Sequence, residues 1–205
     1  MRLVPTGSAG VTIVEPELRS DERVYFARSF DREDFAAAGL EPVVEQANIS
    51  FNHRAGTLRG MHLQIAPAPE AKLVRCTRGA IVDVVVDLRA GSPTFLRHVA
   101  VELNAENRRA LYVPPFFAHG YQTLVADTEV VYQVSGRYTP EAERGLRHDD
   151  PVLAIRWPLP VDSTSPKDAS WPLLPTDGSG PDFATAPFDG ERYAASAPQG
   201  TVGSA

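Results

Sequence analysis

Cysteine is nearly absent from this sequence: Cys76 is the only one among 205 residues. A single cysteine cannot form a disulfide within the chain, and its ordinary interpretation is a small buried side chain. We therefore expect a reducing compartment, the cytoplasm. The sequence also has no run of about 18 apolar residues, so no membrane-spanning helix is expected. Residues 1–10, MRLVPTGSAG, lack the apolar core of a signal peptide.

Basic residues are too few for a nucleic-acid-binding surface. The chain has 20 lysine and arginine residues against 26 aspartate and glutamate residues, a formal net charge of -6. Because nucleic acid requires a basic face, we expect no nucleic-acid partner. A few cations that converge locally can still hold a phosphorylated metabolite. No glycine-rich phosphate loop is present, so nothing indicates a dinucleotide cofactor.

Short segments of strand-like composition dominate the chain from residue 44 onward. They recur at intervals of about ten residues, with proline and glycine between them, which is typical of an all-β sandwich or barrel. The expected strands are 43–51, 56–64, 71–77, 80–88, 98–103, 110–115, 120–126 and 128–138. Segment 80–88 is nearly all β-branched and should be a central strand.

Before these strands, the sequence predicts a short strand and a helix. The strand is expected in VYFARSF, residues 24–30, and the helix over 32–40, with Gly39 closing it. We expect one folded domain over residues 1–175. Residues 176–205 are rich in Gly, Ala, Ser and Pro, so we expect them to form a mobile or loosely attached tail.

Two of the five histidines, His62 and His119, lie in or beside expected strands. A small β-barrel can place both imidazole rings in one cavity. Imidazole is the commonest metal ligand, so a zinc or iron site is one interpretation. A catalytic metal usually takes three protein ligands. The nearest further donors, Gln64 and Glu70, do not complete a convincing set, and the sequence favours a site without metal.

Proton transfer is the second interpretation of these histidines. A neutral histidine can remove a proton from carbon if a carboxylate orients it and cations hold the resulting enolate. Arg59 and Lys72 can supply the cations. Tyr132 alternates with its neighbours, so its hydroxyl can face the same cavity. Asp168 lies beyond the last strand, in a loop that can fold over the cavity mouth.

Each of these residues also has an ordinary structural interpretation. The histidine and the tyrosines can be hydrogen-bonded core or rim side chains. Asp83, an acid inside an apolar strand, most simply pairs with Lys72 or Arg75 across a strand pair. The segment TPEAERGLRHDDP, residues 139–151, is typical of a solvated turn. Convergence of several such residues in one cavity would favour chemistry over these structural roles.

The resemblance to a known family rests on four motifs: GTLRGMHLQ, KLVRCTRGAIVDVVVDLRAGSPTF, YVPPFFAHGYQTL and YTPEAERGLRHDDPVLAIRWP. Together they resemble the dTDP-4-dehydrorhamnose 3,5-epimerase family over residues 11–175. The resemblance implies a cupin-type jelly roll, a homodimer, and no metal or other cofactor. It also implies an epimerase that inverts C3, C5 or both in a nucleoside-diphosphate 4-keto-6-deoxyhexose, in deoxysugar or surface-polysaccharide synthesis.

The resemblance also assigns roles to individual residues. His62 matches the catalytic base, Asp168 its carboxylate partner, and Tyr132 the acid that returns the proton from the opposite face. Arg59, Lys72 and His119 match positions that hold the sugar, its C4 oxygen and the diphosphate. Further contacts are implied for Arg23 and Phe26 on an arm that in some members crosses the dimer, for Gln46 and Asn48 near the base, and secondarily for Tyr138, Glu143 and Lys167.

Two departures from the family pattern leave the nucleotide and the sugar configuration open. Arg28 stands where the family usually has an acidic residue, and the spacing from Gln46 to His62 is one residue longer than in the best-known rhamnose enzymes. The resemblance does not distinguish one epimerisation from two. Two alternatives also remain: a metal-dependent cupin, such as a dioxygenase or sugar isomerase, and a non-catalytic sugar-binding cupin.

Overall fold

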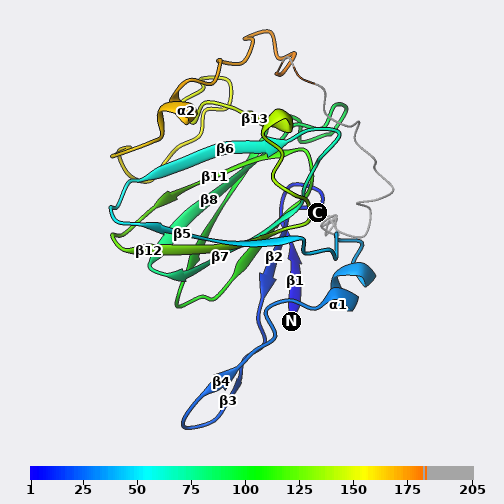
Figure 1. The fold of residues 1–205 in the computed structure, drawn as a ribbon, viewed down its shortest axis with the longest axis vertical. Coiled ribbons are helices and arrows are strands. Elements are labelled where there is room, and N and C mark those ends of the chain that lie inside the picture. Colours follow the sequence, from blue (N-terminus) through cyan, green and yellow to red (C-terminus); the bar gives the residue numbers. More distant parts are fainter. Residues whose placement is uncertain (182, 184–205) are drawn as a thin grey trace, which may run out of the picture.

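Two antiparallel sheets form the body of the described chain (Figure 1). The computed structural model describes residues 1–181 and 183, so most of the predicted tail lies outside the described residues. The six-stranded sheet has the order β1 (Arg2–Pro5), β2 (Thr12–Glu15), β10 (Ala110–Val113), β7 (Lys72–Arg78), β12 (Thr128–Val134) and β5 (Gln46–Asn52). The five-stranded sheet has the order β13 (Glu143–Gly145), β6 (Leu58–Gln64), β11 (Phe117–Thr123), β8 (Ala80–Asp87) and β9 (His98–Asn104).

Strands β5 to β12 are divided between the two sheets as in a jelly roll: the chain changes sheet at each step except from β8 to β9. β5, β12, β7 and β10 are neighbours in one sheet, and β6, β11, β8 and β9 are neighbours in the other. This arrangement of eight antiparallel strands is a pair of Greek keys. The prediction of an all-β jelly roll is confirmed. β8 lies inside its sheet, between β11 and β9, as its β-branched composition predicts.

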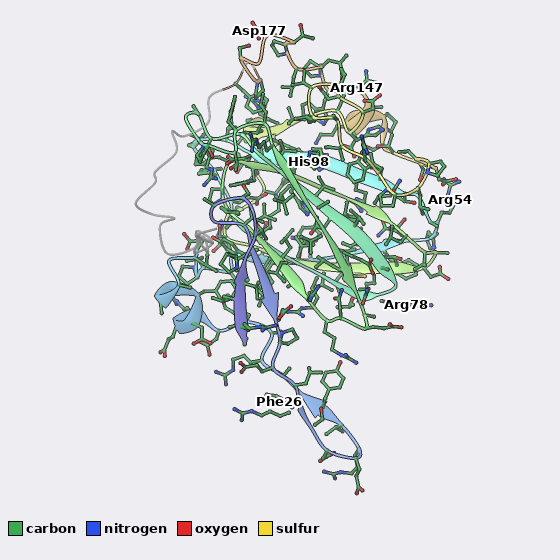
Figure 2. All side chains as sticks on the ribbon, turned by 180° about the vertical axis from the view of Figure 1, so that it is seen from behind. Phe26, Arg54, Arg78, His98, Arg147 and Asp177 are labelled. Carbon is green, nitrogen blue, oxygen red and sulfur yellow. The ribbon has the colours of Figure 1, made fainter. Side chains whose placement is uncertain are left out.

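A hairpin projects from this body and carries two of the predicted nucleotide contacts. β3 (Arg19–Ser20) pairs with β4 (Tyr25–Phe26), and the hairpin extends well beyond the two sheets (Figures 1 and 2). The strand expected over 24–30 is therefore reduced to β4. Phe26 on this hairpin is 65% exposed, although exposed phenylalanine is uncommon on a monomer surface.

The helical segments of the described chain are short. The helix predicted over 32–40 forms as α1 (Arg32–Ala37), because the Asp31 side chain accepts bonds from the first-turn N–H groups and caps it. Gly39 follows at a φ of 71°, the left-handed conformation in which glycine commonly ends a helix. The others are the 3₁₀ turn η1 (Pro140–Ala142) and α2 (Pro166–Ala169). None of these described helices is long and apolar enough to cross a membrane.

The main core lies between the two sheets, and a second cluster covers the outer face of the five-stranded sheet. Cys76 belongs to the main core and is 1% exposed. Burial raises the pKa of its thiol to about 11, so it is a packing residue without nucleophilic character. In the second cluster, Leu146, Leu153 and Leu174 pack against Met61. This packing fixes the segment that carries α2 above the sheet.

Four strands lie where the sequence predicted none: the two-residue β3 of the hairpin, β1, β2 and β13. β1 and β2 precede the predicted strands and were missed because each has only four residues. β13 lies inside segment 139–151, so the solvated-turn interpretation of that segment is wrong: Gly145 and Leu146 are buried against β6. β11 begins at Phe117 rather than Gly120, which places His119 within a strand.

Candidate functional site

His62 and His119 lie opposite each other on neighbouring strands. β6 pairs with antiparallel β11, and His119 is the register partner of His62, with an irregularity in the pairing just beyond. The two strands approach closely there. A Cβ atom on Gly60 would lie 2.5 Å from Gly120 Cα, and Gly60 has a φ of 122°. Only glycine meets both requirements, so the backbone itself brings the two imidazoles together.

Asp168 binds His62 directly. Asp168 Oδ1 lies 2.6 Å from His62 Nε2, and its Oδ2 accepts a hydrogen bond of 3.1 Å from Gly60 N. Burial by itself raises the pKa of Asp168, but the bond to His62, the charge of that ring and the Gly60 N–H outweigh it, and the pKa is lowered. The carboxylate therefore stays ionised at neutral pH. It orients the imidazole and leaves the other ring nitrogen available to a substrate.

α2 carries Asp168 to this position. Ser165 caps the helix, because its hydroxyl accepts the Asp168 N–H. Asp168 is 3% exposed, whereas the His62 side chain keeps 32% of its surface exposed. The His62 imidazole is therefore accessible from the cavity while the Asp168 carboxylate is buried. The sequence predicted that Asp168 lies in a loop that can fold over the cavity mouth. In the structure Asp168 lies against β6, but in the short helix α2 instead of a loop.

Tyr132 reaches the same cavity from the other sheet. It lies on β12, paired with Val74 on one side and Asn48 on the other. Burial raises the pKa of Tyr132; the charge of Arg59 opposes this, and Tyr121 and Glu70 add to it. The phenol is therefore protonated at neutral pH and can donate a proton. The His62 imidazole on β6 and the Tyr132 phenol on β12 therefore lie on opposite walls of the cavity.

The cavity between the sheets has a volume of about 850 Å³. That is the size of pocket that encloses a ligand of several rings. Eleven of the thirteen predicted site residues line it: Gln46, Asn48, Arg59, His62, Lys72, His119, Tyr132, Tyr138, Glu143, Lys167 and Asp168. Arg23 and Phe26 do not. They lie on the projecting hairpin, where Arg23 pairs with Asp21 at 2.9 Å (Figure 2).

Arg59 is held by a buried network of neutral groups. Its Nη1 donates to Ser50 Oγ, which also accepts a hydrogen bond of 3.0 Å from Tyr121 OH. Asn52 Nδ2 donates to Tyr121 OH at 3.3 Å. The sequence analysis missed Ser50, Asn52 and Tyr121. For Ser50 and Asn52 the sequence did contain a signal. Along β5 these two polar residues alternate with the apolar Ile49 and Phe51, and in the structure the polar pair is buried and the apolar pair exposed.

The other cations of the cavity have acidic partners. Lys72 pairs with Glu70, which the sequence analysis weighed only as a metal ligand. Lys167 pairs with Glu143, and Tyr138 OH donates to the same carboxylate at 2.6 Å. Among the lysines and arginines that line the described cavity, Arg59 alone has no ion pair, so it is the strongest position for an anion.

His119 contacts Asp83, and this corrects the expected role of Asp83. His119 Nε2 and Asp83 Oδ1 are 2.6 Å apart, in a geometry that does not form a regular hydrogen bond. Asp83 is fully buried. The predicted pairing of Asp83 with Lys72 or Arg75 is wrong because those residues lie on β7, in the other sheet, whereas β8 pairs with β11.

Metal ligands do not converge among residues 1–181 and 183. No group of three His, Cys, Asp or Glu side chains there has a metal-binding arrangement. Gln64 is occupied by the backbone: its amide donates to Ala68 O and Arg137 O, and its oxygen accepts the Thr139 N–H. These contacts give the metal-dependent alternative no support.

Comparison with known proteins places these features in a family context. Residues 5–176 match the family described as dTDP-4-dehydrorhamnose 3,5-epimerase. The chain is 44% identical over 167 residues to the enzyme of that name from Sinorhizobium fredii, covering 81% of this chain and 86% of the relative. It is 41% identical to a dTDP-4-dehydrorhamnose 3-epimerase from Streptomyces niveus, over 85% of this chain and 84% of the relative.

A solved structure of an epimerase is also similar to this chain. A 3,5-epimerase from Legionella pneumophila, in complex with dTDP-4-keto-L-rhamnose, superposes with a TM-score of 0.78 at 38% identity. The match covers 84% of this chain and 92% of the Legionella chain. The similarity therefore extends through the jelly roll and the segment that carries Asp168.

Proposed function

The chain belongs to the dTDP-4-dehydrorhamnose 3,5-epimerase family, and on that premise we propose that it inverts C3, C5 or both in a nucleoside-diphosphate 4-keto-6-deoxyhexose. It is an isomerase of the epimerase type. The proposed substrate is dTDP-4-dehydro-6-deoxyglucose or a related deoxysugar. The observation that carries the proposal is the pair His62–Asp168 on one wall of a cavity whose other wall bears Tyr132.

The proposed mechanism uses the acidity of carbons beside a ketone. C3 and C5 both flank the C4 carbonyl, so His62 can remove either proton as the electron pair moves into a C–C double bond and charge collects on the C4 oxygen. Lys72 and His119, which line the cavity, stabilise that oxyanion. Tyr132 then protonates the carbon from the other side, and the ketone forms again. Proton transfer of this kind requires no redox cofactor.

Proton NMR in heavy water tests the proposed function. With dTDP-4-dehydro-6-deoxyglucose as substrate, we expect the signals of H3, H5 or both to disappear as deuterium enters, together with the signals of the inverted product. The number of exchanging positions distinguishes single from double epimerisation. Binding without exchange would favour a sugar-binding protein. Chelator-sensitive turnover with stoichiometric metal would favour a metal-dependent enzyme.

Arg59 is the proposed anchor for the diphosphate, because its described partners are neutral. We expect Arg59→Gln to weaken dTDP binding about ten- to a hundredfold, the usual loss for a charged hydrogen-bonded pair. Isothermal titration calorimetry at fixed salt measures this. Arg54→Gln is the matched control, since Arg54 lines the same cavity but pairs with Asp162 at 3.1 Å. Equal losses in both variants would contradict a specific role for Arg59.

The homodimer and the cytoplasmic location stay predictions. Exposed apolar side chains on the edge strand β5 and the hairpin support a self-association surface: Ile49 is 71% exposed and Phe26 is 65% exposed. In such a dimer the hairpin can bring Arg23 and Phe26 to a partner's cavity, as proposed for these residues by family resemblance. Arg28, at a usually acidic position, pairs with Asp31 of its own chain.

A further inference from the structure

The contact between β13 and the end of α2 lies directly beside the base. Gly145 on β13 is the register partner of His62 on β6. Residues opposite each other in an antiparallel pair direct their side chains to the same face of the sheet. The position that a side chain at residue 145 would take is therefore next to the His62 imidazole, on the cavity face of the sheet.

The Trp171 indole occupies that position. A Cβ atom on Gly145 would lie 2.2 Å from Trp171 Cε2 and also 2.2 Å from Nε1. Gly145 is not in the left-handed region, so its backbone would accept alanine, and the indole is what excludes a side chain. Trp171 follows α2 by two residues. Its contact with β13 therefore links the strand beside His62 to the helix that carries Asp168.

Packing alone maintains this contact. The Trp171 Nε1 atom is buried and has no hydrogen-bond acceptor among the described residues. The other link between α2 and β13 is the Lys167–Glu143 ion pair, in which the Lys167 side chain is 50% exposed. Its partner Glu143 is 11% exposed, so the pair also restrains α2. The apolar contact and the ion pair therefore together set how far α2 lies from β13.

We propose that Gly145 and Trp171 are positioning residues that set the distance between Asp168 and His62. The proposal rests on the proposed function of His62 as the base. The carboxylate lies 2.6 Å from His62 Nε2, and such a bond tolerates little displacement. If the indole moved away from β13 by about an ångström, α2 would move with it and the bond would lengthen, at a cost of up to about a hundredfold in rate.

Gly145→Ala tests this directly. We expect kcat to fall about ten- to a hundredfold while KM changes less than about threefold, because the substrate contacts stay in place. Gly7→Ala is the matched control, since a Cβ there meets nothing within 4 Å. Trp171→Leu, which shortens the side chain, should also lower kcat. The double variant should recover part of the rate lost in Gly145→Ala, because leucine leaves room for the new methyl group.

A second readout is independent of turnover. The ¹⁵N chemical shifts of the His62 ring report its bond to Asp168, and Asp168→Asn gives the reference for a broken bond. We expect Gly145→Ala to move these shifts toward that reference while Gly7→Ala does not. If Gly145→Ala fails to fold, the kcat and the His62 ring ¹⁵N shifts of Trp171→Leu test the inference instead. Wild-type kcat and ring shifts in the folded variants, or single-variant losses that simply add in the double variant, would overturn the inference. Absence of epimerisation by the wild type, with the ring shifts moved as expected, would instead refute the proposed function.

Discussion

His62→Ala is expected to lower epimerisation by about 10²- to 10⁴-fold, the usual contribution of a general base. Solvent deuterium should no longer enter C3 or C5, because the variant lacks the imidazole that Asp168 orients and that the proposal assigns to proton removal. Binding of dTDP should stay within about tenfold, since Arg59 rather than His62 is the proposed phosphate contact. Proton NMR in heavy water and calorimetry measure the two quantities.

The control for this variant is His98→Ala. His98, labelled in Figure 2, is exposed on the edge strand β9 and is not among the residues that line the cavity. It should exchange deuterium at the wild-type rate. Persistent exchange at C3 or C5 in His62→Ala would remove the base from the mechanism, whatever happened to binding.

Tyr132→Phe is expected to separate exchange from inversion. His62 can still remove a proton and return a deuteron to the same face, so deuterium should continue to enter the substrate. The rate at which the inverted product forms should fall at least about a hundredfold, because the opposite face has lost its acid. In the wild type this acid form is present at neutral pH and is lost only as pH rises through the pKa of Tyr132, which burial raises above 10.

Tyr112→Phe is the matched control for loss of a buried phenol. Tyr112 is 3% exposed, accepts a hydrogen bond from Glu41 N and packs in the cluster around α1, outside the cavity. It should leave both rates near the wild-type values. Parallel loss of exchange and inversion in Tyr132→Phe would mean that the phenol assists proton removal instead of delivering the proton on the far side.

Strand composition predicted the fold because it reflects burial. The β-branched run of β8 and the alternation of β6 are properties of the segments themselves, so the sequence contained them. The resemblance to a family supplied the jelly-roll fold, without a predicted order of the strands. β13 could not be predicted in this way: three residues, Glu143–Gly145, carry no periodicity, and they form a strand only because β6 offers an unpaired edge.

The residues of the candidate site were predicted together with one contact, that between His62 and Asp168, but the other contacts were not. His62, Asp168 and Tyr132 were identified through the family motifs, whereas the partner of Asp83 was not. A buried acid signals that a partner exists, and only the sheet order reveals that β8 adjoins β11 and brings it to His119. Trp171 gave no signal at all, because its contact is with a residue that has no side chain.

Gly60 and Gly120 approach each other with no side chain between them. This close approach separates two tasks, the spacing of the two imidazoles and the shaping of the cavity. Spacing of the two imidazoles is built into the main chain, whereas side chains on β5 and on the segment around Ser163 line the cavity. An engineer who seeks new sugars can therefore vary cavity-lining positions of β5 such as Gln46 and Asn48, provided that Gly60, Gly120, the Ser50–Asn52 network around Arg59 and the Ser165 cap are left unchanged.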